Sequence, residues 1–212
     1  MHFFIQYLWE NPKFFFSWML FVVFSVSLHE FMHAFVALKE GDDTAARLGH
    51  LTLNPFRQMG IVSLIMLVLV GFCWGAVPVD RRNLRHKYSD LRVSLAGPFT
   101  NLGLFLVFGL IAGLAYRFMP HVTEGSKQEF LIMMFFQGSF MNMVLFLFNM
   151  LPVPGFDGYS LIENFVPQEL KYSEFFKGTS IVVLMLALFF SDKLFDIGQT
   201  AAYMLVNLIG LL

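Results

Sequence analysis

The sequence predicts an all-α integral membrane protein with about five to six hydrophobic segments. Of its 212 residues, 57% are hydrophobic and only 14% are charged, whereas a soluble globular domain carries roughly a quarter charged residues. The hydrophobic residues also form long unbroken blocks, and a block of about 20 apolar residues is what a helix needs to cross a bilayer. The formal net charge of −1 gives no reason to expect a nucleic-acid partner.

Three of these blocks are long enough to cross the membrane as single helices: residues 14–38, 93–116 and 130–151. The second and third contain no charged residue. Polar residues interrupt the first block at His29, Glu30 and His33, and the third block at Gln137, Asn142 and Asn149. We expect these three blocks to form a three-helix core.

The remaining hydrophobic segments are shorter or less regular. Residues 179–190 are too few to cross unaided at about 1.5 Å per helical residue, and residues 194–212 are long enough. They form either two helices or one broken helix with an interfacial tail. Residues 60–76 are apolar but barely long enough to span.

Loop charges predict the orientation, because short cytoplasmic loops are enriched in Lys and Arg. Loop 77–92 contains five such residues, loop 39–59 contains three, and loop 117–129 contains two. The first two loops are therefore predicted to be cytoplasmic and the third external. The segment 60–76 then begins and ends on the same side and should be re-entrant, while 43–57 suits a short β-hairpin at the membrane surface.

The first block contains the motif His29-Glu30-Phe31-Met32-His33. Spacing of four residues places both imidazoles on one helix face, where they can bind one zinc ion with the glutamate beside it to activate water. Ionisable groups inside an apolar span are costly and indicate a function. The alternative is a polar cluster that joins helices by hydrogen bonds.

A catalytic zinc ion needs a third protein ligand and an open position for water. His86 and His121 lie among hydrophilic loop residues, and His50 lies outside the span. Asp157 is the favoured candidate because it follows the third block directly in a Pro/Gly-rich stretch. The alternative for Asp157 is an Asx turn or a helix cap.

Three motifs together resemble the site-2 protease family of intramembrane zinc metalloproteases, in a minimal form without a PDZ domain. The family joins HExxH to Ala-Gly-Pro-x-x-Asn and to a later Asn-x-x-Pro-x-Pro-x-x-Asp-Gly. Here the second motif is Ala96-Gly97-Pro98-Phe99-Thr100-Asn101, and the third runs from Asn149 to Gly158. The family's usual Leu-Asp-Gly-Gly is replaced by Phe156-Asp157-Gly158-Tyr159, which keeps the ligand.

The resemblance implies a role for each matched residue. His29, His33 and Asp157 would hold one zinc ion per chain, and Glu30 would be the catalytic glutamate. Asn101 would contact the substrate backbone or the developing oxyanion, the alternative being an interhelical hydrogen bond. Asn149 would help to position the substrate.

The expected protein is therefore one membrane-embedded metalloprotease domain over 1–212, with its catalytic core in about 14–160. Its expected partners are a transmembrane protein substrate and the lipid bilayer. The expected location is a bacterial inner membrane, with the active site nearer the cytoplasmic side. A transporter and a catalytically silent scaffold are the alternatives. The intact glutamate argues against the scaffold, and the lack of an internal repeat argues against the transporter. The sequence does not predict the oligomeric state.

Overall fold

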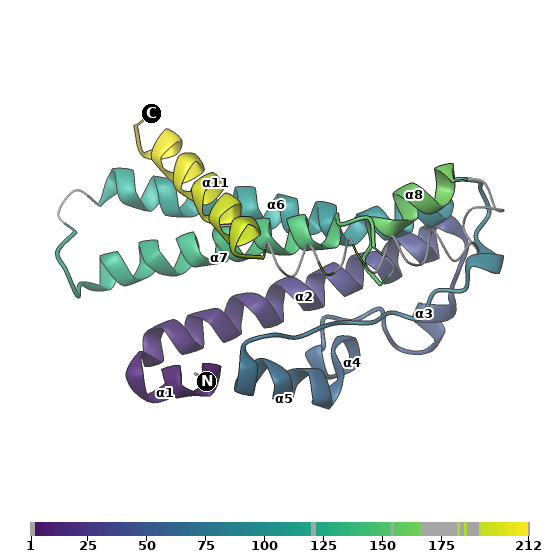
Figure 1. Ribbon diagram of the computed structural model, residues 1–212, viewed down its shortest axis with the longest axis horizontal. Helices are drawn as coiled ribbons and strands as arrows, with labels where there is room; N and C mark the ends of the chain where they lie inside the picture. Colours follow the sequence, from purple (N-terminus) through teal and green to yellow (C-terminus); the bar gives the residue numbers. More distant parts are fainter. Residues whose placement is uncertain are drawn as a thin grey trace.

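A computed structural model describes residues 3–119, 122–153, 155–166, 182, 185 and 191–211. The described part is helical, and its long helices lie side by side (Figure 1). The elements in chain order are η1 (Phe4–Gln6), α1 (Tyr7–Glu10), α2 (Pro12–Glu40), α3 (Thr44–Arg47), α4 (Pro55–Gln58), α5 (Gly60–Val70), η2 (Arg81–Asn83), α6 (Ser89–Phe118), α7 (Lys127–Asn149), α8 (Tyr159–Phe165) and α11 (Ser191–Leu211).

The core consists of α2, α6 and α7, which confirms the three predicted helices. Their 29, 30 and 23 residues correspond to about 43, 45 and 34 Å at 1.5 Å per residue. The hydrocarbon layer is about 30 Å thick, so each helix is long enough and apolar enough to cross it.

Contacts between the three helices show the direction in which each one runs. On α2, Phe21 packs edge-on against Phe108 of α6, with ring centroids 4.8 Å apart. Further along α2, the His33 ring bonds the Val93 carbonyl, so α6 is antiparallel to α2. Ser17 bonds Gln137 and Ser25 bonds Asn142, so the residue numbers of both helices increase in the same direction and α7 runs parallel to α2.

The start and the end of α2 are both defined by local chemistry. The Asn11 side chain accepts a hydrogen bond from the Phe14 N–H, and Pro12 occupies the first helical position, where no donor is needed. Gly41 ends the helix with φ +112°, a left-handed conformation that glycine adopts without strain.

A fourth apolar helix, α11, packs against α6 and α7. It begins at Ser191, so the Ser191-Asp192-Lys193 sequence is its first turn, and its length permits a crossing. The close packing depends on glycines, because a Cβ on Gly113 of α6 would lie 2.6 Å from Ile209 of α11. Most of the predicted segment 179–190 lies outside the described residues.

The segment predicted to be re-entrant runs out along α2 and returns. Helix α5 has only 11 residues, about 16 Å, and it ends at Gly71 with φ +80°. The chain then returns in extended form over 72–80, on the side of α2 opposite α7 in Figure 1. The Ala76 N–H donates to the Gln58 carbonyl (3.0 Å), so the two ends of the excursion meet.

Asp42 connects the extended segment to the end of α2 by hydrogen bonds. Its buried carboxylate accepts hydrogen bonds from the Asp80 N–H (2.7 Å), the Asn83 side chain (3.0 Å) and the Thr44 hydroxyl (2.5 Å). Burial opposes the charge, but these donors outweigh it and lower the pKa of Asp42. The ionised form, which is present at neutral pH, is the form that holds this corner together.

The β-hairpin predicted over 43–57 is wrong. All these residues are described, and they form the helical turns of α3 and the first residues of α4 with no strand between them. Local capping favours the helical turns: Asp42 accepts from the Thr44 N–H, and Asn54 accepts from the Phe56 N–H with Pro55 at the first helical position.

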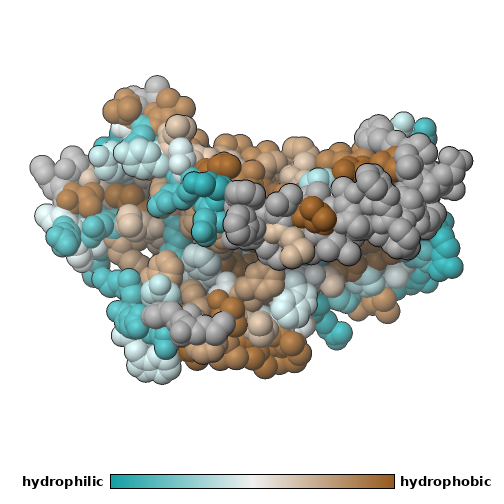
Figure 2. All heavy atoms as spheres, in the orientation of Figure 1, coloured by the Kyte–Doolittle hydropathy of each residue, from teal (hydrophilic) through white to brown (hydrophobic). Residues whose placement is uncertain are grey.

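The surface fits a protein embedded in lipid. Figure 2 shows apolar side chains over α5 and hydrophilic ones gathered at the end of the molecule near α3. Large apolar residues are exposed along the helices, including Ile61 and Val62 on α5, Leu106 on α6 and Leu208 on α11. Such a surface is stable against lipid and costly in water.

The excursion through α5 predicts that both of its ends are reached from one side of the membrane. Arg57 and Lys87 are exposed and flank it. We expect Arg57→Cys and Lys87→Cys, each in a Cys73→Ala background, to react with a membrane-impermeant maleimide from the cytoplasmic side only. Labelling of the two positions from opposite sides would show that this segment spans the bilayer.

Candidate functional site

The two histidines of the HExxH motif lie on the buried face of α2, where it meets α6. His29 and His33 are 6% and 8% exposed. Their Nε2 atoms are 3.0 Å apart, which confirms that the four-residue spacing brings the rings together on one face.

Asp157 reaches the same point from the loop that follows α7. Its Oδ2 lies 3.0 Å from Nε2 of His29, and its Oδ1 lies 3.3 Å from Nε2 of His33. The loop is closed at its base by a hydrogen bond from the Gly158 N–H to the Asn149 carbonyl (2.6 Å). The Asp157 carbonyl also accepts from the Ser160 hydroxyl (2.9 Å) at the start of α8. The aspartate is therefore held by a short closed loop.

These three residues form a group that can hold a metal ion. Zinc bonds to nitrogen and carboxylate oxygen are 2.0–2.2 Å long, so the edge between two ligands of a tetrahedral site is about 3.3 Å. The two Nε2 atoms are 3.0 Å apart, and each lies 3.0 or 3.3 Å from a different oxygen of Asp157, so these separations are close to that edge. Two imidazole nitrogens and one carboxylate oxygen are also a donor set that zinc accepts.

The other ring nitrogens are engaged in a way that directs the Nε2 lone pairs to this point. Nδ1 of His33 donates to the Val93 carbonyl (2.7 Å), which can only accept. Nδ1 of His29 lies 2.6 Å from Oδ1 of Asn101. Such partners fix the tautomer of a metal-binding histidine. The three inward-facing atoms would repel one another unless a cation or a proton lay among them.

Asp157 carries a negative charge that would attract such a cation. Burial opposes its ionisation, but when the His29 and His33 rings carry protons on Nε2, their hydrogen bonds and charge outweigh burial and hold the pKa of Asp157 at about 2; a bound cation would take the place of those protons. The carboxylate is therefore anionic at neutral pH and is available as a metal ligand.

Two glycines leave the space that the site requires. A Cβ on Gly97 of α6 would lie 2.3 Å from Nε2 of His33 and 2.4 Å from Nε2 of His29. A Cβ on Gly75 of the extended segment would lie 2.3 Å from Oε1 of Glu30. Real Cβ atoms do not approach other atoms so closely, so glycine at these positions keeps the metal position and the glutamate clear.

The other predicted residues have different surroundings. Asn101 is fully buried, and both ends of its side chain are hydrogen bonded to protein, so its contact with substrate stays a prediction. Asn149 lies at the end of α7 and closes the Asp157 loop through its backbone. His86 is exposed and His50 is partly buried, and neither joins the metal-binding group. His121 lies outside the described residues.

Sequence reasoning missed four contributors to the site: Gly75, Gly97, the Val93 carbonyl and Asn142. Asn142 had a signal, because it is an amide inside an uncharged 22-residue block, and such a residue is costly there unless it is bonded. The Val93 contact had none, since any residue supplies a carbonyl.

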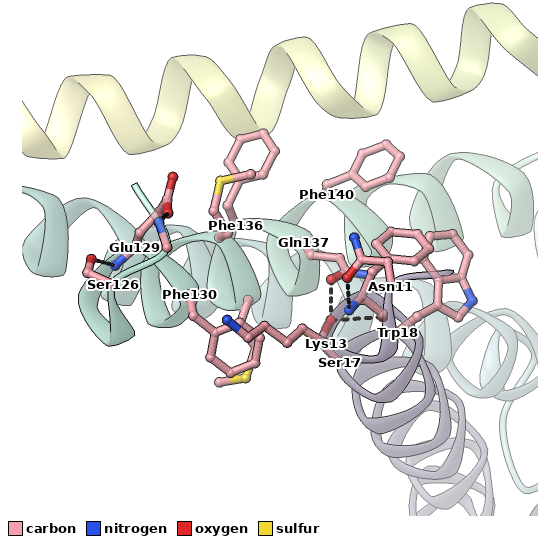
Figure 3. A pocket seen from close by; sticks show the side chains of 14 residues that line it. Asn11, Lys13, Ser17, Trp18, Ser126, Glu129, Phe130, Phe136, Gln137 and Phe140 are labelled. Carbon is pink, nitrogen blue, oxygen red and sulfur yellow. Dashed lines mark hydrogen bonds between the residues drawn. The ribbon is translucent and has the colours of Figure 1, made fainter. Parts of the chain in front are cut away.

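A separate cavity of about 410 Å³ lies between the starts of α2 and α7 (Figure 3). Its walls include Trp18 and Phe140, with the Ser17 hydroxyl donating to Gln137 (2.6 Å). Ser17 precedes His29 by about 18 Å along α2. This cavity is therefore remote from the metal-binding group.

Two histidines and an adjacent glutamate on a membrane helix, completed by an aspartate from a second helix end, define a metalloprotease-type site. The chain belongs to peptidase family M50, whose family model matches residues 17–190. This confirms the resemblance to site-2 proteases.

Individual relatives agree with the family. The chain is 38% identical over 152 residues to a Bacillus subtilis (strain 168) protein named "Putative zinc metalloprotease YwhC", covering 69% of this chain and 67% of that protein. Two mycobacterial proteins named Rip2 carry the same description. The one from Mycolicibacterium smegmatis is 36% identical over 148 residues, 66% of this chain and 53% of that protein. The one from Mycobacterium tuberculosis (strain H37Rv) is 32% identical over 194 residues, 88% of this chain and 71% of that protein.

The chain thus spans about two thirds of the Bacillus relative and about half of the M. smegmatis one. No solved structure matches the chain. The cofactor that the relatives' names indicate is zinc, which agrees with the donor set formed by His29, His33 and Asp157.

The two glycines predict separable effects. We expect Gly97→Ala to abolish zinc binding, because its methyl group would lie against both Nε2 atoms. Gly75→Ala should leave zinc near one per chain and remove proteolysis, because the three atoms nearest to the added methyl group all belong to Glu30. Metal analysis of the purified proteins checks both variants, and full zinc occupancy in Gly97→Ala would contradict the metal position.

Proposed function

We propose that this protein is an intramembrane zinc metalloendopeptidase that hydrolyses peptide bonds in transmembrane or membrane-proximal segments of protein substrates. The observation that carries the proposal is the position of the site. His33 and His29 precede the end of α2 at Glu40 by about 10 and 16 Å, within a helix apolar enough to span the membrane. A bond cut there must enter the bilayer or lie at its edge.

In this proposal His29, His33 and Asp157 hold one zinc ion per chain, and Glu30 is the catalytic base. Bound zinc acts as a Lewis acid and lowers the pKa of a coordinated water molecule. Glu30 would take a proton from the attacking water and pass it to the leaving amine. Its place supports this role, because it follows His29 directly and its carboxylate lies against Gly75.

The extended segment beside Glu30 is suited to hold a substrate. The Ser63 hydroxyl bonds both the N–H and the carbonyl of Trp74, at 2.8 and 2.6 Å. The Trp74 and Ala76 backbone edges therefore face α4 and α5. Because successive residues of an extended chain point their backbone groups in opposite directions, Gly75 and Val77 face the other way, and within the described residues no hydrogen bond engages their backbone groups.

A substrate segment that pairs with Gly75 and Val77 would lie extended beside Glu30. This matters because the carbonyls of a substrate helix are already hydrogen bonded, so the helix must unwind before water attacks. Asn149, at the mouth of the Asp157 loop, is proposed to position the same segment. We further propose a bacterial inner membrane as the location, with the site nearer the cytoplasmic side, as the basic loops indicate.

The proposal predicts that Glu30→Gln keeps the fold and one zinc per chain and loses proteolysis. The amide preserves shape but cannot accept a proton, and removing a general base costs about 10² to 10⁴ in rate. The measurement is cleavage of a single-pass membrane protein by purified enzyme in vesicles, with zinc content determined in parallel. Glu163→Gln, an acid of α8 outside the site, serves as the matched control. Cleavage by Glu30→Gln at the wild-type rate would refute the assigned mechanism.

A further inference from the structure

A chain of buried hydrogen bonds leads away from the metal-binding group into the core. Oδ1 of Asn101 meets Nδ1 of His29 (2.6 Å), and Nδ2 of Asn101 donates to Oδ1 of Asn142 (3.0 Å). Nδ2 of Asn142 donates to the Ser25 hydroxyl and to the Gly138 carbonyl, both at 2.8 Å. The chain thus connects α2, α6 and α7.

The side chains that these hydrogen bonds connect to His29 are all fully buried. Asn101, Asn142 and Ser25 are each 0% exposed. Water therefore does not compete for their donors and acceptors, and an unmatched amide in such a place costs about 1 to 3 kcal/mol. Each amide is consequently held to the one orientation that satisfies its neighbours.

The Gly138 carbonyl determines that orientation. A backbone carbonyl only accepts, so the Asn142 atom that faces it must be the NH₂ group, and Oδ1 of Asn142 must face Asn101. Oδ1 accepts from the NH₂ group of Asn101, which turns Oδ1 of Asn101 towards His29. That oxygen also only accepts, so Nδ1 of His29 must carry the ring proton. Nε2 of His29 is then left with a lone pair directed at Asp157 and His33.

We propose that Asn142 is a positioning residue for the metal site: through Asn101 it fixes the tautomer of His29 that can bind zinc. Its hydrogen bonds within the described residues go to Asn101, Ser25 and Gly138, and none goes to a metal-binding side chain or to Glu30. Within the described residues the Asn101 side chain bonds only His29 and Asn142, so without Asn142 its amide can take either orientation. The flipped amide presents NH₂ to Nδ1, and the ring proton moves to Nε2, where it competes with zinc. The inference rests on His29 being a ligand in the proposed function and does not depend on proteolysis.

The test is zinc affinity, measured by competition with a chromophoric chelator on purified protein in detergent. Loss of a residue that orients a metal ligand costs about 10- to 100-fold in metal affinity, and we expect that loss for Asn142→Ala and for Asn101→Ala. The double variant should bind zinc no more weakly than Asn101→Ala alone, because Asn142 acts only through Asn101. Substituted Co²⁺ should show the corresponding change in its visible absorption.

Ser139→Ala is the matched control. Ser139 is also fully buried on α7, and its hydroxyl donates across to the Phe105 carbonyl of α6 (2.9 Å). It thus joins α6 and α7 by a hydrogen bond that is not connected to Asn101 or Asn142. Loss of this bond should change zinc affinity by less than about twofold. If Asn142→Ala does not fold, Asn142→Ser replaces it. A serine there can still bond the Gly138 carbonyl four residues back but is too short to meet Asn101.

Wild-type zinc affinity in a folded Asn142 variant would overturn the inference, and so would additive losses in the double variant. His29→Ala separates this failure from failure of the metal site itself. If His29→Ala loses zinc while the Asn142 variants keep it, only the positioning role is refuted. If His29→Ala also keeps zinc, the ligand assignment of the proposed function is refuted as well.

Discussion

Three lone-pair atoms face one another inside an apolar bundle, and the surrounding structure is arranged to make that possible. Nε2 of His29, Nε2 of His33 and the Asp157 carboxylate lie 3.0 to 3.3 Å apart. Such a group is unstable in a low-dielectric interior without a positive charge among its members. The requirement for a cation explains why the Nδ1 atoms of both rings face acceptor oxygens, those of Asn101 and Val93, and why glycine lies where α6 passes the two rings.

The helix directions follow from the same constraint. The histidines are near the end of α2, and the aspartate is just beyond the end of α7, so those two helices must run the same way. The connection between them is α6, which returns in the opposite direction and passes the site at Gly97. One helix therefore supplies the connection, the space for the ion and, through Asn101 and the Val93 carbonyl, the partners of both rings.

Much of this arrangement could be predicted from the sequence, because it is expressed in residue types and spacing. Apolar blocks of spanning length predicted α2, α6 and α7, and HExxH at helical spacing predicted that the two rings meet. The hairpin over 43–57 was wrong because Thr and Leu residues scattered among polar ones, such as Thr44, Leu48 and Leu51, indicated strands there. The capping groups of Asp42 and Asn54, which favour helical turns, decide the conformation there. The role of Gly75 could not be predicted, since its closeness to Glu30 arises from tertiary packing alone.

The loop that carries Asp157 also has a consequence for biogenesis. Its aspartate lies far along the chain from the histidines and is fixed only once α7 has ended and Gly158 has closed the loop onto Asn149. A partly synthesised chain whose first two core helices have already entered the membrane therefore holds two of the three metal-binding side chains. The complete metal-binding group forms only with insertion of the third core helix and the loop after it.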